Sequence, residues 1–173
     1  MKYDWTKFKK EVYIQAPLEK VYDAWAVPSQ IIQWFIEEAI YTQSSEEQRG
    51  ATEQIGDGDS YYWSWHQDLE AAGKVFEVVP NQRLQFSFGK RSPDSDEDIL
   101  VDVEVSAEED GYTKLSLLQS NMPDTPYGHR YHLSCNLGWS FFMTNLKGWL
   151  EHGIDLREKN PNRVDAARAI SAA

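Results

Sequence analysis

The spacing of apolar residues changes once along this chain, and that change constrains the fold more than any other feature. Between residues 60 and 117, apolar residues occupy alternate positions, which is typical of half-buried strands. Between residues 132 and 158 they recur every three or four positions, which is typical of one face of a helix. No helical pattern interrupts the strands, so the sequence predicts an antiparallel meander followed by a long helix.

Turn residues and glycines refine this pattern. Pro80-Asn81 ends an expected strand over residues 73–79, and Asp110-Gly111 is a hairpin signal before the last strand. Gly138 and Gly148 lie inside the expected helix, where each costs about 1 kcal/mol relative to Ala. We expect these two glycines to mark a close approach of the helix to the sheet.

The first 58 residues combine strands with short helices. Residues 8–16 have the alternation of a strand, and Pro17 suits the first turn of a helix because its missing N–H has no partner there in any case. Ser29 is the expected N-cap of a second short helix over residues 31–35. Residues 38–43 suit another strand, and residues 44–58 are polar and read as a loop.

The composition indicates a well-packed acidic domain. Aromatic residues make up 13% of the 173 residues, and the formal net charge is −11. This charge disfavours nucleic acid and anionic membrane surfaces as partners. The single cysteine, Cys135, cannot form an internal disulfide. Because the chain also lacks a signal-peptide pattern and any apolar run of membrane-spanning length, we expect a cytoplasmic protein without membrane insertion.

Large apolar side chains gather on the faces that the expected helices and strands turn inward. They form either an apolar ligand pocket between helix and sheet or a core that fills this space with its own rings. Gln119 ends an inward-facing row, where its amide orients a ligand or is satisfied by backbone or water. The candidate ligand-binding residues are Trp25, Trp34, Trp63, Trp65, Phe86, Phe88, Gln119, Trp139, Phe142, Met143 and Leu146.

The sequence offers little for catalysis, cofactors or metals. His129 and His132 do not make a zinc site, which needs three or four converging ligands, and the acidic residues 94–98 lack the glycine and glutamate of a calcium loop. No phosphate-binding or dinucleotide motif is present. We therefore expect no metal, no cofactor and no catalytic residue, although a convergence of Tyr41, Glu53 and His66 stays open.

Four segments together resemble a known family. They are VYIQAPLEKVYDAWAVPSQIIQWF, GKVFEVVPNQRLQFSF, TKLSLLQSNM and GWSFFMTNLKGWLEHG, and they span residues 8–158. They resemble the START-like helix-grip (SRPBCC) superfamily, and within it the single-domain homologues of the C-terminal domain of the heat-shock-protein-90 ATPase activator. The loop over residues 44–58 is longer and more acidic than the family's usual link, and the activator's separate N-terminal domain has no counterpart here.

The resemblance implies an α+β helix-grip fold, like that of the birch-pollen allergen, in which a curved antiparallel sheet wraps a long C-terminal helix accompanied by two short helices. One such domain would span residues 1–160, followed by a short tail over residues 161–173.

Three functions are compatible with this fold. The preferred one is the binding of a small apolar or amphipathic molecule, such as a lipid, a polyketide-like compound or an aromatic compound. The second is a co-chaperone-like regulator of a heat-shock ATPase, which would connect the protein with the stress response. The third is a cyclase-type or hydrolase-type enzyme, which the fold alone does not imply. Homodimerisation is left open by the sequence.

Overall fold

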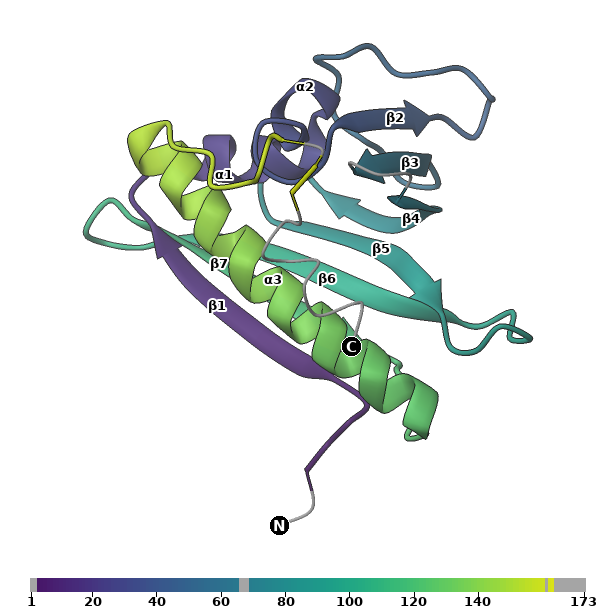
Figure 1. The fold of residues 1–173 in the computed structure, drawn as a ribbon. Coiled ribbons are helices and arrows are strands. Elements are labelled where there is room, and N and C mark those ends of the chain that lie inside the picture. The colour runs from purple at the N-terminus through teal and green to yellow at the C-terminus, as the bar shows by residue number, and fades with distance from the viewer. Residues whose placement is uncertain (1–2, 66–68, 161, 164–173) are drawn as a thin grey trace.

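The computed structural model describes residues 3–65, 69–160 and 162–163, and it contains one sheet and one long helix (Figure 1). The elements follow in the order β1 (Phe8–Ile14), α1 (Leu18–Ala26), α2 (Pro28–Ile31), β2 (Glu38–Thr42), β3 (Ser60–Trp65), β4 (Leu69–Val79), β5 (Arg83–Lys90), β6 (Asp98–Ala107), β7 (Thr113–Ser120) and α3 (Pro126–His152). The helix-grip fold expected from the sequence is therefore confirmed.

All seven strands belong to one antiparallel sheet with the order β1-β7-β6-β5-β4-β3-β2. Strands β2 to β7 follow one another as a meander, and β1 adds to the far edge by pairing with β7. The register shifts between Val75 and Glu77 in β4 and between Ser87 and Lys90 in β5. Such irregularities increase the local twist, which helps the sheet to curve around the helix.

The long helix α3 crosses one face of this sheet, and α1 and α2 lie at one end of it (Figure 1). The side chain of Thr125 caps its N-terminus by accepting a hydrogen bond from Gly128 N, and Pro126 occupies the first turn. At the other end, Gly153 adopts a left-handed conformation with φ of 68°. These two caps place α3 about six residues earlier than the spacing of apolar residues predicted.

The short helices differ from the expectation in one detail. Helix α1 begins directly after Pro17 and buries Val21 and Trp25, as predicted. The prediction of Ser29 as the next N-cap was wrong: Val27 occupies that position and Pro28 is the first residue of α2. Since proline suits the first helical turn, it moves the start of α2 ahead of the serine.

Much of the space between helix and sheet is filled by large side chains. Trp34 is fully buried, and its Nε1 donates to Ala24 O at 2.8 Å. Trp139 is 2% exposed, and its Nε1 donates to Gln119 Oε1 at 2.7 Å. Met143 and Leu146 continue the buried side of α3. Burial of the indole of Trp139 against the sheet confirms the orientation predicted for the long helix.

The loop over residues 44–58 is held to the domain at several points. Ser29 N donates to Ala51 O at 2.9 Å, and Ile55 N donates to Ala26 O at 2.8 Å. The guanidinium of Arg49 pairs with Asp59, which is 2% exposed. This loop therefore covers the junction of α1 and α2. In the part of the chain that the structure describes, no helix is both long and apolar enough to cross a lipid bilayer.

Candidate functional site

A pocket of about 660 Å³ lies between α3, strands β3 to β5 and the segment that links α2 to β2. Residues 157–160 and 163, which follow α3, contribute to its lining. Six aromatic rings line it: Phe35, Trp65, Phe88, Tyr131, Trp139 and Phe142. The space is thus bounded mainly by apolar side chains that come from α3, from strands β3 to β5 and from the segment after α2.

The aromatic rings of the wall contact one another in fixed geometries. The ring of Phe35 stacks on that of Trp139 with centroids 5.1 Å apart, and it meets Phe142 edge-on at 4.8 Å. Trp65 also meets Phe35 edge-on at 5.1 Å. Phe88 lies 5.3 Å from Trp139 on the sheet side. Because edge-on and offset pairs stabilise each ring in place, this wall is largely formed before any ligand arrives.

The structure places four of the eleven candidate residues on the pocket wall, namely Trp65, Phe88, Trp139 and Phe142. The other seven lie in the packed interior and are 4% exposed or less: Trp25, Trp34, Trp63, Phe86, Gln119, Met143 and Leu146.

Sequence reasoning missed several wall residues, including Phe35, Tyr131 and Gly138. A signal for those in α3 was present. Tyr131, Cys135, Gly138 and Phe142 follow one another at intervals of four, three and four, which puts them on one face of a helix. This face adjoins the buried one that contains Met143 and Leu146, and Trp139 belongs to both, since it is buried and also lines the pocket.

Polar groups on the α3 side of the pocket are neutral. Burial raises the pKa of the Cys135 thiol to about 11, although hydrogen bonding with Gln119 and Tyr131 acts in the opposite direction. Burial likewise raises the pKa of the Tyr131 hydroxyl, which donates to Phe88 O at 2.6 Å. A thiol held protonated at neutral pH is a poor nucleophile, so this wall is suited to contact rather than to covalent chemistry.

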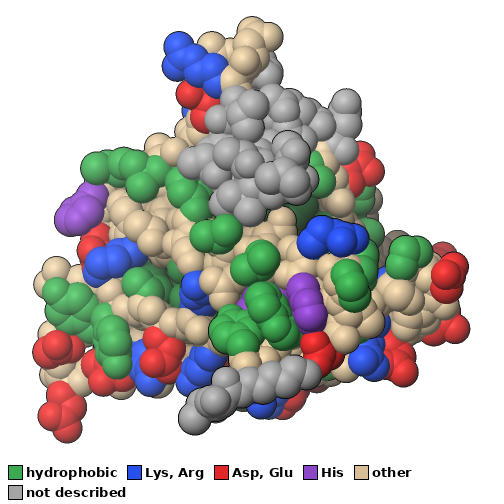
Figure 2. Space-filling view, turned by 60° about the horizontal axis from the view of Figure 1, so that its bottom comes forward, with side chains coloured by type: hydrophobic (Ala, Val, Ile, Leu, Met, Phe, Trp, Pro, Cys, Tyr) green, Lys and Arg blue, Asp and Glu red, His purple; other side chains and the backbone are tan. Residues whose placement is uncertain are grey.

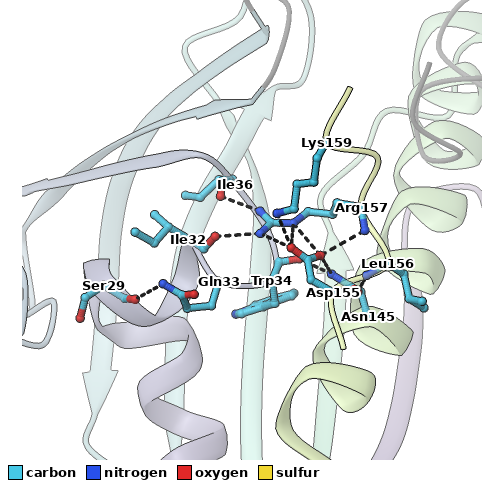
Figure 3. Close-up of polar contacts among 10 residues, drawn as sticks. All are labelled: Ser29, Ile32, Gln33, Trp34, Ile36, Asn145, Asp155, Leu156, Arg157 and Lys159. Atoms are coloured by element: carbon cyan, nitrogen blue, oxygen red, sulfur yellow. Dashed lines mark hydrogen bonds and ion pairs between the residues drawn. The ribbon is translucent and has the colours of Figure 1, made fainter. Parts of the chain in front are cut away.

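Arg157, which lines the pocket, belongs to a network with Asn145 and Asp155 that we call the 145–157 network (Figure 3). The guanidinium of Arg157 donates to Ile36 O at 2.7 Å and to Ile32 O at 2.9 Å. It also pairs with Asp155 at 2.7 Å. Arg157 therefore joins the segment after α3 to the segment after α2.

Asn145 anchors the same network from within α3 (Figure 3). It is fully buried, and its Nδ2 donates to Trp34 O at 2.7 Å and to Asp155 Oδ1 at 3.0 Å. Its Oδ1 accepts from Leu156 N at 2.6 Å. Burial by itself raises the pKa of Asp155, but hydrogen bonds from Arg157 and neighbouring groups outweigh it and hold the pKa well below its usual range.

Charges among the lining residues balance. Three acidic residues, Glu37, Glu70 and Glu158, face three basic ones, Arg157, Lys159 and Arg163. This balance contrasts with the formal net charge of −11 for the whole chain. The lining therefore carries no excess charge that would select a strongly anionic or cationic ligand.

Tyr41 and Glu53, two of the three residues left open for catalysis, do not line the pocket. Tyr41 is buried elsewhere, where its hydroxyl donates to Trp25 O at 3.0 Å. Glu53 is exposed and accepts from Gly50 N at 2.6 Å. His66 lies outside the described residues. Within residues 3–65, 69–160 and 162–163, no group of three or more His, Cys, Asp and Glu side chains is arranged to hold a metal ion.

Two histidines of α3 serve a different region, near the N-terminus of the chain. The ring of His132 is within 3.0 Å of Trp5 O through Nδ1 and within 2.9 Å of the Tyr3 hydroxyl through Nε2. His129 stacks on the ring of Trp5 with centroids 4.5 Å apart. These contacts fix the residues before β1 to the start of α3 and take both rings away from the pocket.

Comparisons with known proteins agree with this architecture. The model of the family described as activator of Hsp90 ATPase homolog 1-like protein matches residues 15–151. A search of curated proteins found no match.

Several solved structures share the fold at low sequence identity. The protein SSP2350 from Staphylococcus saprophyticus is 17% identical, with a TM-score of 0.67 over 87% of this chain and 96% of that one. The Aha1 dimer from Colwellia psychrerythraea is 21% identical, with a TM-score of 0.67 over 85% of this chain and 97% of that one. CalU16 from Micromonospora echinospora is 19% identical, with a TM-score of 0.62 over 85% and 77%.

Proposed function

Since this chain belongs to the family of activator of Hsp90 ATPase homolog 1-like proteins, we propose that it binds a small, uncharged apolar or amphipathic molecule in the pocket beside α3. The pocket volume of about 660 Å³ is the observation that supports this proposal most directly. It lies within the range of ~300–1,000 Å³ that is typical of small-molecule sites. We place this activity in the cytoplasm and in a single domain over residues 1–160.

The aromatic wall supports a ligand with flat apolar surface. Rings such as Phe35 and Trp139 offer faces and edges against which a planar molecule can pack. A ligand that buries roughly 300 Å² of apolar surface gains about 7 kcal/mol from the hydrophobic effect before the entropic cost of binding. Since a dissociation constant of 1 μM requires about 8 kcal/mol, we expect dissociation constants above about 10 μM for simple apolar compounds.

Uptake of the neutral dye N-phenyl-1-naphthylamine tests the proposal, because the fluorescence of this dye rises in apolar surroundings. A dye molecule bound in the pocket would also be close enough to Trp65 and Trp139 for energy transfer from either indole. We expect saturable binding by the wild-type protein. Phe142→Gln, on the pocket wall, should weaken binding at least tenfold. Leu137→Gln is the matched control, since Leu137 lies on the same helix, is 45% exposed and does not line the pocket.

Two outcomes would count against ligand binding. One is an absence of any saturable dye signal with folded wild-type protein. The other is equal loss of affinity in Phe142→Gln and Leu137→Gln, which would place the dye outside the pocket. If the dye does bind in the pocket, mass spectrometry of the protein purified under native conditions from its host would identify a retained natural compound by its added mass.

The family's description favours a second function, namely regulation of a heat-shock ATPase by direct docking. The formal net charge of −11 suits a basic partner surface. On the face drawn in Figure 2, however, acidic and basic side chains are interspersed, so the acidic excess is not gathered there. Steady-state ATP hydrolysis by purified Hsp90 should rise at least twofold with this protein in excess, and an unchanged rate would remove this candidate.

A further inference from the structure

Gly138 occupies the centre of the α3 face that lines the pocket. It follows Cys135 by three residues and precedes Phe142 by four, and all three residues line the pocket. In a helix this spacing directs the three positions to the same side. A side chain at position 138 would therefore project into the pocket.

A glycine inside a helix weakens the helix, so its presence calls for a reason. The usual one is close packing, and two other glycines of this chain have it. A Cβ on Gly128 would meet Pro123 O at 1.8 Å, and one on Gly89 would meet the Tyr131 hydroxyl at 2.4 Å. Among the described residues, a Cβ on Gly138 would have no atom within 4 Å beyond its chain neighbours and the adjoining backbone of its own helix. The expectation that this glycine marks a close approach to the sheet was wrong, because the space beside it is open.

Gly148 provides the comparison within the same helix. A Cβ at that position would meet Ile154 O at 3.4 Å, which is contact with the segment after α3 rather than with the sheet. Gly148 does not line the pocket. The two glycines carry the same helical cost, but a side chain at position 148 would contact the segment after α3, whereas one at position 138 would enter the pocket.

We propose that Gly138 is a specificity-determining residue, whose missing side chain leaves a notch in the pocket wall for a flat, uncharged ring system lying against the backbone of α3. This inference rests on the proposed ligand-binding function. The ring of Phe142 and the thiol of Cys135 flank the notch, and Ala71 and Ala72 of β4 line the same pocket. Small side chains on the β4 side leave room for a ligand that extends from the notch.

The groups around the notch indicate that a ligand bound there is uncharged and makes no hydrogen bonds to the helix backbone. Backbone amides in the middle of α3 are already bonded within the helix, so they offer a ligand surface contact and no free hydrogen-bonding group. The neighbouring Cys135 thiol is neutral because burial raises its pKa to about 11. The charges of the lining residues balance. A fused-ring hydrocarbon or a similar planar neutral compound meets all three conditions.

Two substitutions at position 138 test the proposal with N-phenyl-1-naphthylamine as the probe. Gly138→Phe fills the notch and should weaken dye binding about tenfold or more. Gly138→Ala removes the helical penalty and should raise the melting temperature by about 2–4 °C while weakening binding measurably. Gly148→Ala should raise the melting temperature without changing binding, and Thr144→Phe, on the exposed side of α3, should leave binding unchanged.

A gain in stability together with a loss of affinity is the result that an ordinary structural glycine would not produce. If the wild-type protein binds the dye and Gly138→Phe binds it equally well, the notch proposal fails while ligand binding stands. If Gly138→Ala lowers the melting temperature, the glycine has a structural role and the proposal also fails. If the folded wild-type protein takes up no dye, the proposed function and this inference fail together.

Discussion

Replacement of Asn145 by leucine should strongly destabilise the protein, because this buried amide joins three parts of the chain. Its Nδ2 donates to Trp34 O and its Oδ1 accepts from Leu156 N, at 2.7 and 2.6 Å. Leucine has nearly the same size and keeps the helix, but it can neither donate nor accept. The substitution therefore isolates the polar function of the side chain from its volume.

The expected magnitude follows from the groups left without partners. Trp34 O and Leu156 N each lose a bond, and an unsatisfied buried group costs about 1–3 kcal/mol. Asp155 keeps its pair with Arg157, so it adds less. Some of this cost is offset by the apolar surface of the leucine, so we expect a net loss of about 3 kcal/mol in the free energy of unfolding. For a domain stabilised by about 5–15 kcal/mol, that is a large fraction.

Urea denaturation followed by tryptophan fluorescence measures this loss. With a typical slope of about 2 kcal/mol/M, the midpoint should fall by about 1.5 M while the slope stays the same. Asn136→Leu is the control, because it makes the same chemical change at a half-buried position of α3 for which no side-chain bond is observed within the described residues. A loss below 1 kcal/mol for Asn145→Leu, or equal losses in both variants, would refute the reasoning.

Three other outcomes follow from buried polar groups. Burial lowers the pKa of His132 below its ordinary 6.5, so the unfolded chain takes up this proton more readily than the folded protein. The free energy of unfolding should therefore fall as the pH drops from 7 to 5. His132→Gln should show a smaller fall over this range, and an equal fall would contradict this cause. The Cys135 thiol, with its pKa raised to about 11 by burial, should react with iodoacetamide at pH 8 at least tenfold more slowly than free cysteine, and equal rates would show it to be accessible. Asp59→Ala should lower the free energy of unfolding by about 3 kcal/mol, because Arg49 and Gly56 N lose their acceptor. Thermal unfolding measures this loss, and a loss below 1 kcal/mol would mean that these contacts do not hold the loop.

Local patterns were sufficient to predict the strands and their connections. Each expected strand has its counterpart among β1 to β7, because period-two alternation and turn signals such as Asp110-Gly111 act over a few residues. The ends of α3 were less well predicted. Its true start follows the cap formed by Thr125 and Pro126, while the apolar spacing becomes regular only later. Capping residues therefore define the bounds of this helix better than periodicity does.

The site could be predicted only in part, because some of its contacts join residues that are far apart in the sequence. Trp139 and Phe142 were identified because apolar side chains on a helix are readily recognised. The contact between Asn145 and Trp34 O, in contrast, joins residues 111 positions apart, and no local pattern indicates it. Gly138 was noticed as a helical glycine, but whether its open side faced the sheet or a pocket depended on the three-dimensional packing.

The structure implies that α3 serves stability and binding with different sides. Met143 and Leu146 are buried and do not line the pocket, whereas Cys135 and Gly138 lie on the face that lines it. Substitutions on the buried side should change the free energy of unfolding first, because they leave cavities in packed surroundings. Those on the pocket side meet open space, so they can change affinity at little cost to folding. Ligand preference could therefore vary between proteins of this fold while the packed half of the helix stays the same.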